Sequence, residues 1–171
     1  MELGKWIEAI KGNERWHIEL YETPVNLPEG VKEHEAALPP IYIAFIKTVK
    51  TAMTDLVWIV EDDPVDSSIW AYTAEDMRGN KPNDWIGEFK RISLEAAEGD
   101  DEMIAEIESF WSGHIPVLVS LSSGYAFHAL RLSDGKIVHG FEPEFEKTSV
   151  IADDFAGWLE LTASGEFRKH L

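Results

Sequence analysis

Apolar residues recur at helical spacing in the first twelve positions and at strand spacing directly after them. The first helix has an apolar face with the i, i+3, i+4, i+7 pattern, and Gly12 is suited to end this helix. Its members are Leu3, Trp6, Ile7 and Ile10. Residues 15–22 then alternate between apolar and polar side chains, so we expect a half-buried strand there.

Helical spacing returns after a loop that is marked by prolines and a glycine. Residues 31–38 are compatible with a short helix, and apolar positions from 41 to 53 predict a longer one. Pro40 fits the first turn of that longer helix, because its missing N–H has no partner there. A short β-branched run over residues 56–60 predicts the next strand.

The middle of the chain combines a short strand, a helix cap and an acidic helix. We expect a strand over residues 69–72, followed by a helix that Thr73 and Asp76 cap. An apolar stripe then predicts a helix whose acidic residues face solvent. The stripe consists of Met103, Ile104, Ile107, Phe110 and Trp111, and the acidic residues are Asp101, Glu102, Glu106 and Glu108.

The last third of the chain predicts a three-stranded antiparallel meander closed by one helix. Residues 115–130 hold two strands and a turn, and Asp134-Gly135 forms the next turn before a strand over 136–141. Asp153 and Asp154 are expected to cap the closing helix, contributing on the order of 1 kcal/mol. We therefore expect one α+β domain over residues 1–171, with a mainly antiparallel β-sheet and flanking helices.

Composition narrows the possible functions further. The chain has no cysteine, which excludes thiol catalysis, disulfides and cysteine-ligated zinc. Charged residues interrupt the first twelve positions, and no run suits a membrane-spanning helix, so we expect a cytoplasmic protein. The net charge of −17 disfavours binding to nucleic acid or anionic lipid and speeds encounter with basic partners. Solubility alone is the alternative explanation of that charge.

The familiar signatures of nucleotide, metal and serine-hydrolase sites are missing, so no cofactor is expected. Ser122 or Ser123 with a nearby histidine is a less favoured catalytic alternative, because serine before glycine is mainly a turn residue. His114, His128 and His139, with Glu142 or Glu144, are a less favoured metal site. The acidic residues at 61–66 lack the glycine and closing glutamate of a calcium loop.

The order of short motifs between residues 36 and 160 resembles the SMI1/KNR4 (SUKH) family. The matching elements are Leu38-Pro39 with Tyr42 and Phe45, Phe110-Trp111-Ser112-Gly113, Ile115-Pro116, Gly124-Tyr125, Asp134-Gly135, and Ala152-Asp153-Asp154-Phe155 with Leu159. The family includes bacterial immunity proteins, so the resemblance implies a noncatalytic protein that neutralises a cognate toxin by direct binding. Such toxins are often nucleases, whose surfaces are basic.

The expected partner is therefore a basic toxin domain. We expect the contacts to come from acidic side chains and one tryptophan in a loop, because aromatic anchors dominate many interfaces. The expected contact residues are Asp62, Asp63, Trp85, Asp101, Glu102 and Glu106. Two alternatives remain, namely a cellular regulatory or scaffold protein of the same family and a small hydrolase that uses serine and histidine residues of the meander.

Overall fold

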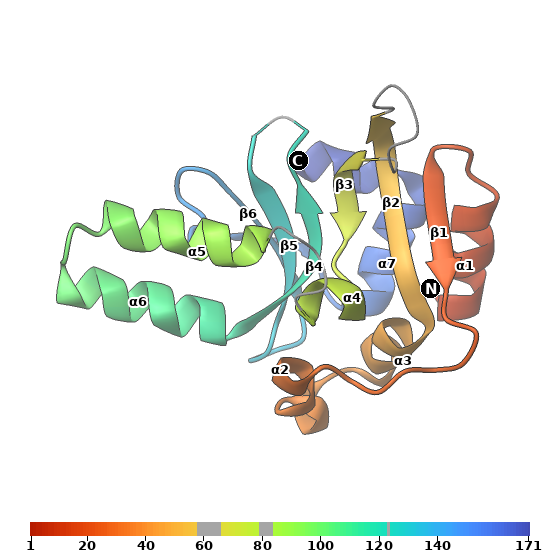
Figure 1. Ribbon diagram of the computed structural model, residues 1–171, viewed down its shortest axis with the longest axis horizontal. Coiled ribbons are helices and arrows are strands. Elements are labelled where there is room, and N and C mark those ends of the chain that lie inside the picture. The colour runs from red at the N-terminus through yellow and green to blue at the C-terminus, as the bar shows by residue number, and fades with distance from the viewer. Residues whose placement is uncertain (58–65, 79–83, 123) are drawn as a thin grey trace.

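Seven strands of the described chain form one antiparallel sheet (Figure 1). The computed structural model describes residues 1–57, 66–78, 84–122 and 124–171. Each strand pairs with the next one along the sequence, so the sheet order follows the chain order. The strands are β1 (Trp16–Leu20), β2 (Val49–Val57), β3 (Asp66–Ala71), β4 (His114–Ser120), β5 (Ala126–Arg131), β6 (Ile137–Phe141) and β7 (Ser149–Ala152). The expected α+β class and antiparallel sheet are confirmed.

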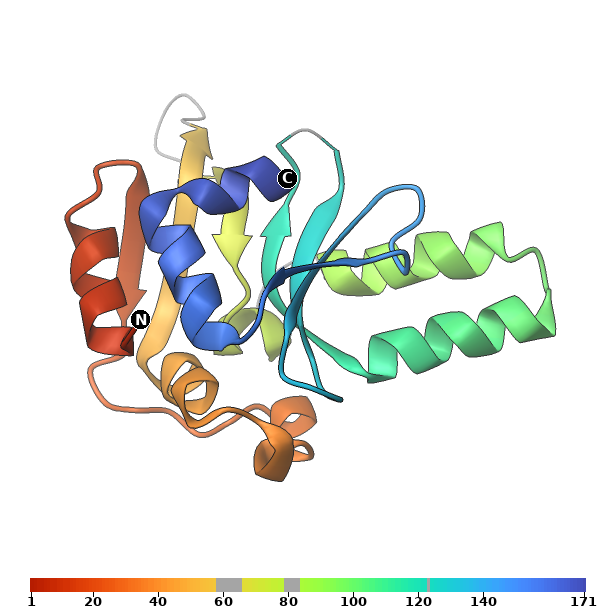
Figure 2. The same ribbon diagram turned by 180° about the vertical axis from the view of Figure 1, so that it is seen from behind.

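Helices flank the sheet on both faces, but they cover the two faces differently. The helical elements are α1 (Leu3–Lys11), α2 (Glu29–Lys32), η1 (Glu35–Ala37), α3 (Pro40–Thr48), α4 (Ala74–Met77), α5 (Trp85–Ala96), α6 (Asp101–Ser112), α7 (Phe155–Ser164) and η2 (Glu166–His170). Helices α1 and α7 lie against the face that is turned to the viewer in Figure 2. Helices α5 and α6 form a hairpin that extends away from the sheet in both views.

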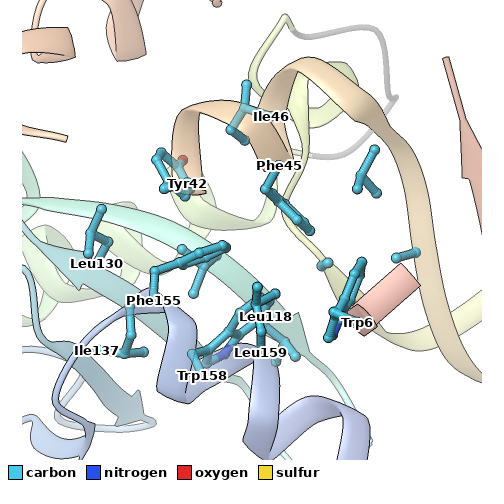
Figure 3. Close-up of a cluster of buried hydrophobic side chains, with 14 of the residues drawn as sticks. Trp6, Tyr42, Phe45, Ile46, Leu118, Leu130, Ile137, Phe155, Trp158 and Leu159 are labelled. Atoms are coloured by element: carbon cyan, nitrogen blue, oxygen red, sulfur yellow. The ribbon is translucent and has the colours of Figure 1, made fainter. Parts of the chain in front are cut away.

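The larger apolar cluster, called the back core here, lies between the sheet and helices α1, α3 and α7. Its aromatic centre consists of Trp6, Tyr42, Phe45, Phe155 and Trp158, all fully buried (Figure 3). Phe45 lies edge-on to Trp6 and to Phe155, with ring centroids 5.5 and 5.4 Å apart. These contacts join three helices that lie far apart in the sequence.

The smaller apolar cluster, called the front cluster here, joins the α5–α6 hairpin to strands β4–β6. It consists of Tyr72, Phe89, Val119, Phe127, Ala129, Val138 and Phe145, with half-buried side chains of α5 and α6 against it. Phe89 stacks on Phe145 at 4.8 Å. A Cβ on Gly140 would lie 2.5 Å from the Phe145 carbonyl oxygen and 2.6 Å from the Phe127 ring, so only glycine permits this packing.

Two of the predicted helices differ from the observed ones. The helix expected over residues 41–53 ends at Thr48, and Val49 begins strand β2. Pairing of β2 with two neighbouring strands overrides the helical spacing, and the β-branched residues of this segment favour that outcome. The helix expected over 31–38 is also wrong, because α2 ends at Lys32 and a separate 3₁₀ turn follows.

Two further elements were not predicted at all. Helix α5 contains Trp85, which was expected in a loop, and its apolar side chains lie at i, i+4 and i+7 (Trp85, Phe89 and Ile92). That spacing was present in the sequence and indicates a helix. Strand β7 is a four-residue edge strand whose first two residues are exposed and last two half-buried without alternating, so it has no strand pattern in the sequence.

The expected helix caps are confirmed in two places and corrected in one. Asp76 accepts a hydrogen bond from the Thr73 backbone N–H at 2.8 Å, as predicted for α4. At α7, Asp154 accepts from the Gly157 N–H at 2.7 Å. Asp153 is not a cap, because its side chain is 92% exposed and lies 3.4 Å from the Lys136 ammonium. None of the described helices has the length and apolarity needed to cross a membrane.

Candidate functional site

The α5–α6 hairpin is positioned by aspartate caps at both helix starts. Asp84 accepts a hydrogen bond from the Gly87 N–H at 3.0 Å and so begins α5. Asp100 accepts from the N–H groups of Glu102 and Met103, at 3.0 and 3.1 Å, and begins α6. Both caps satisfy backbone donors that a helix start leaves open.

One carboxylate fastens both helices of the hairpin to the segment that follows β6. Glu146 accepts a hydrogen bond from the Trp111 indole N–H of α6 at 2.8 Å and from the Ser93 hydroxyl of α5 at 3.1 Å. Hydrogen bonds to a carboxylate are stronger than those between neutral groups. The hairpin is therefore held by a polar clamp in addition to the packing of Phe89.

Exposed acidic residues gather at the end of the hairpin that lies farthest from the sheet in Figure 1. This acidic tip consists of Glu98, Asp100, Asp101, Glu102, Met103 and Glu106. Within the described residues, no basic side chain forms an ion pair with any of these five carboxylates. Met103 is 46% exposed among them. The tip therefore combines uncompensated negative charge with one exposed apolar side chain.

The flank of the hairpin nearer the sheet has its charges paired. Arg91 donates a hydrogen bond to Glu88 at 2.9 Å and also pairs with Glu95, one turn further along α5. The hydrogen bond from Arg91 holds the pKa of the Glu88 carboxyl below its usual range. Lys90 of α5 pairs with Glu108 of α6. The negative field of the hairpin is thus strongest at its tip.

The six expected contact residues fall into three groups. Asp101, Glu102 and Glu106 lie together on the acidic tip. Trp85 lies at the opposite end of the hairpin, where it is half-buried against Tyr125 with ring centroids 5.7 Å apart. Asp62 and Asp63 lie outside the described residues. A contact role for all six residues stays a prediction.

Sequence reasoning missed the exposure of Met103. Its helical spacing placed it in the apolar stripe of α6, together with Ile107, which is buried. The hairpin extends past the sheet, so the first turn of α6 has no neighbour to cover the stripe. The sequence signal that could have indicated this exposure is a hydrophobic residue flanked by acidic residues at the start of a helix.

A second feature is a hollow of about 450 Å³ beside the ends of β5 and β6. Its lining comes from three segments: residues 124–126, residues 139–142 and the end of the chain at 169–171. Within it, Phe141 is 54% exposed and its ring stacks on His139 at 5.5 Å. The Glu142 carboxylate accepts a hydrogen bond from the Tyr125 N–H at 3.1 Å.

Two histidines with lowered pKa values lie side by side at this hollow, and one of them, His139, lines it. His128 and His139 are paired across β5 and β6, with ring centroids 5.7 Å apart. Burial, with a smaller effect of His139, lowers the pKa of His128 to about 3. Burial, with a smaller effect of His170, lowers the pKa of His139 to about 4. Both rings are therefore neutral near pH 7.

The neutral state of His128 fits its hydrogen bonds. Its Nδ1 accepts from the Trp158 indole N–H at 3.2 Å, which leaves Nε2 as the protonated nitrogen. The His170 backbone lies near the ring, but no described group completes a hydrogen bond to Nε2. The Nε2 atom of His139 is also buried without a hydrogen-bond partner among the described residues.

The residues considered for catalysis or metal binding are not brought together. Ser122 lies 3.1 Å from the Ser120 hydroxyl, and none of its described hydrogen bonds involves a histidine, while Ser123 is outside the described residues. His114 stacks on Phe110 at 4.1 Å, away from the other two histidines. Within the described ranges, no three histidine or acidic side chains are placed to hold a metal ion.

The fold and the hairpin define an α+β protein with a meander sheet and a projecting acidic hairpin. Comparison of the chain with models of protein families, with curated proteins and with solved structures gives no match.

Proposed function

We propose that this chain is a noncatalytic binding protein whose acidic tip docks onto a basic protein surface. The observation that carries the proposal is the exposed Met103 among five exposed carboxylates, none of them in an ion pair with a described basic side chain, on a projecting hairpin. An isolated group of surface acids serves solubility equally well. An exposed apolar side chain within such a group adds a contact that a partner can bury, which solubility does not need.

Charge and the apolar side chain have separate roles in this proposal. With a net charge of −17, the protein attracts basic partners from a distance, and the tip orients the encounter. Burial of Met103 in the partner then slows dissociation, because desolvated apolar anchors contribute most to residence time. Methionine suits this role since its unbranched side chain adapts to irregular surfaces.

The finer form of the proposal is an immunity protein that neutralises a bacterial toxin in the cytoplasm. A toxin that cleaves nucleic acid has a basic active-site surface, because it must bind phosphate. An acidic tip that occupies this surface excludes the substrate by charge mimicry. The motif order that resembles the SMI1/KNR4 family supports this form, and the absence of familiar catalytic motifs in the sequence agrees with it.

Co-expression with toxins encoded beside the native gene tests the proposal. We expect the protein to protect cells from one of them, and the triple variant Asp101→Lys/Glu102→Lys/Glu106→Lys to lose that protection. Failure against every neighbouring toxin would remove the immunity function and leave a scaffold protein as the alternative. Loss of protection without loss of folding is confirmed by an unchanged thermal unfolding curve.

A matched control separates local charge from total charge. The triple variant Glu8→Lys/Glu14→Lys/Glu33→Lys changes the net charge equally, at exposed sites outside the hairpin. We expect it to keep protection and to slow association only modestly. Equal loss in both triple variants contradicts docking at the tip. For the wild type, the association rate should fall steeply between low and high salt.

A further inference from the structure

The hollow beside β5 and β6 has the size and the aromatic wall of a small-molecule site. Its volume of about 450 Å³ lies within the usual range for ligand pockets, roughly 300–1,000 Å³. It is formed where three segments distant in sequence meet, so it belongs to the folded domain and not to one loop. The acidic tip lies on another part of the molecule (Figures 1 and 2).

An exposed aromatic ring forms part of this hollow. Phe141 is 54% exposed, the highest value among the described large apolar residues that are exposed. Its ring is nearly parallel to that of His139, with an angle of 16° between the planes. Tyr125 also lines the hollow. Planar ligands gain from offset stacking on such rings.

Two side chains that can carry positive charge, Lys169 and His170, line the edge of the hollow. Arg168 precedes them in η2, but its guanidinium donates to the Thr54 hydroxyl at 3.0 Å and does not line the hollow. Lys169 forms an exposed pair with Glu166 at 2.7 Å, which a ligand anion displaces at little cost. The Glu142 carboxylate opposes an anion, but one of its oxygens accepts from the Tyr125 N–H.

We propose that this hollow binds a small planar aromatic carboxylate, with its ring against Phe141 and its carboxylate toward Lys169 and His170. The stacked ring recognises planarity, and the basic edge recognises negative charge. This site is independent of the acidic tip, so its ligand is not the partner protein.

Three matched probes test the proposal by amide NMR titration of the full-length chain. The probe 4-hydroxybenzoate should shift amide signals in residues 124–126, 139–142 and 169–171, with a dissociation constant on the order of 0.1–1 mM. Cyclohexanecarboxylate lacks the planar ring, and 4-hydroxybenzamide lacks the charge. Each should bind at least about fivefold more weakly.

Variants then assign the contacts without disturbing the fold. Phe141→Ala should weaken 4-hydroxybenzoate binding about tenfold, whereas Val150→Ala, at a similarly exposed apolar residue away from the hollow, should not change it. Lys169→Gln should weaken binding about two- to fivefold. Glu142→Gln should strengthen it by a similar factor, because an opposing charge is removed and the amide oxygen still accepts from the Tyr125 N–H.

Several outcomes overturn the proposal. No saturable shift up to 10 mM 4-hydroxybenzoate means that the hollow is not such a site. Equal affinity for the benzamide, or tighter binding of 4-hydroxybenzylamine, means that the basic edge does not select an anion. Unchanged affinity in Phe141→Ala means that stacking on this ring plays no part. None of these results affects docking at the acidic tip, which is tested with different variants.

Discussion

The back core and the front cluster differ in how many parts of the chain depend on them. The back core joins α1, α3 and α7 to the sheet, and two of its buried indoles have internal partners: Trp6 donates to Thr162 at 2.8 Å and Trp158 to His128 at 3.2 Å. The front cluster holds one helical hairpin, with a single carboxylate as its polar clamp. Because more helices depend on the back core, we expect it to determine global stability, while the front cluster determines how firmly the projecting hairpin is held.

The largest expected effect comes from cavities in the two clusters. Phe45→Ala removes a ring that contacts aromatic residues of α1 and α7, so the free energy of unfolding should fall by about 3–5 kcal/mol. Phe89→Ala leaves a comparable cavity, but the hairpin alone depends on it. Urea unfolding measures the loss of stability in Phe45→Ala. In Phe89→Ala, hydrogen exchange should show faster opening mainly in residues 85–112.

Equal global destabilisation by both substitutions, with uniform exchange, would contradict this division. Phe141→Ala is the control for loss of a phenyl ring without a cavity, because its side chain is largely exposed. It should lower the free energy of unfolding by less than about 1 kcal/mol.

The second effect is a loss of stability in mild acid that originates in the histidines on the back side of the sheet. Because the folded pKa values of His128 and His139 lie below the usual 6.5, the unfolded chain binds protons first as the pH falls. Stability is unaffected above about pH 7. It should decrease from pH 6.5 downward, toward about pH 4 for His139 and about pH 3 for His128. The slope for fully buried His128 is up to about 1.4 kcal/mol per pH unit.

Urea unfolding between pH 7 and 5 measures this slope, before most carboxylates titrate. His139 adds less than His128 because solvent reaches part of its ring, and His114, whose pKa burial also lowers, adds a share from the front side. His128→Gln should flatten the dependence. If that variant does not fold, NMR of the wild type decides, since an imidazole of His128 that titrates above pH 6 contradicts the assignment.

The sequence predicted the elements whose stabilising contacts are local. It failed where contacts between distant segments determine the secondary structure or the exposure of a side chain. Alternation identified β1 and the meander, and local polar pairs identified the caps at Thr73 and Asp154. Residues 49–53 have helical spacing but become part of β2, because two strands distant in sequence pair with them. Met103 lies in an apolar stripe, yet only the projection of the hairpin leaves it exposed. The hollow at Phe141 unites three separate segments, which no local pattern records.

The third prediction concerns the clamp at Glu146. Glu146→Gln keeps the shape of the side chain but removes the charge that strengthens its bonds to Trp111 and Ser93. We expect a loss of about 1–2 kcal/mol, seen as faster hydrogen exchange in α5 and α6 with little change in the strands. The matched control is Glu144→Gln, whose exposed carboxylate pairs only with Lys147 among the described residues. Unchanged hydrogen exchange in α5 and α6 would show that the Glu146 charge does not help to hold the hairpin.

The smallest effects come from the helix caps at Asp154 and Asp100, one on each side of the comparison between the back core and the hairpin. Asp154→Ala and Asp100→Ala each remove a carboxylate that accepts backbone N–H bonds, at about 1 kcal/mol apiece. Loss at Asp154 loosens α7, which carries Phe155 and Trp158 of the back core, so the midpoint of global unfolding should fall. Loss at Asp100 should instead appear as faster exchange at the start of α6. Asp153→Ala is the matched control, because Asp153 lies next to the α7 cap but accepts no N–H bond from any described helix, and it should leave both measurements unchanged. A shift of the unfolding midpoint equal to that of Asp154→Ala would show that negative charge, not capping, stabilises the start of α7.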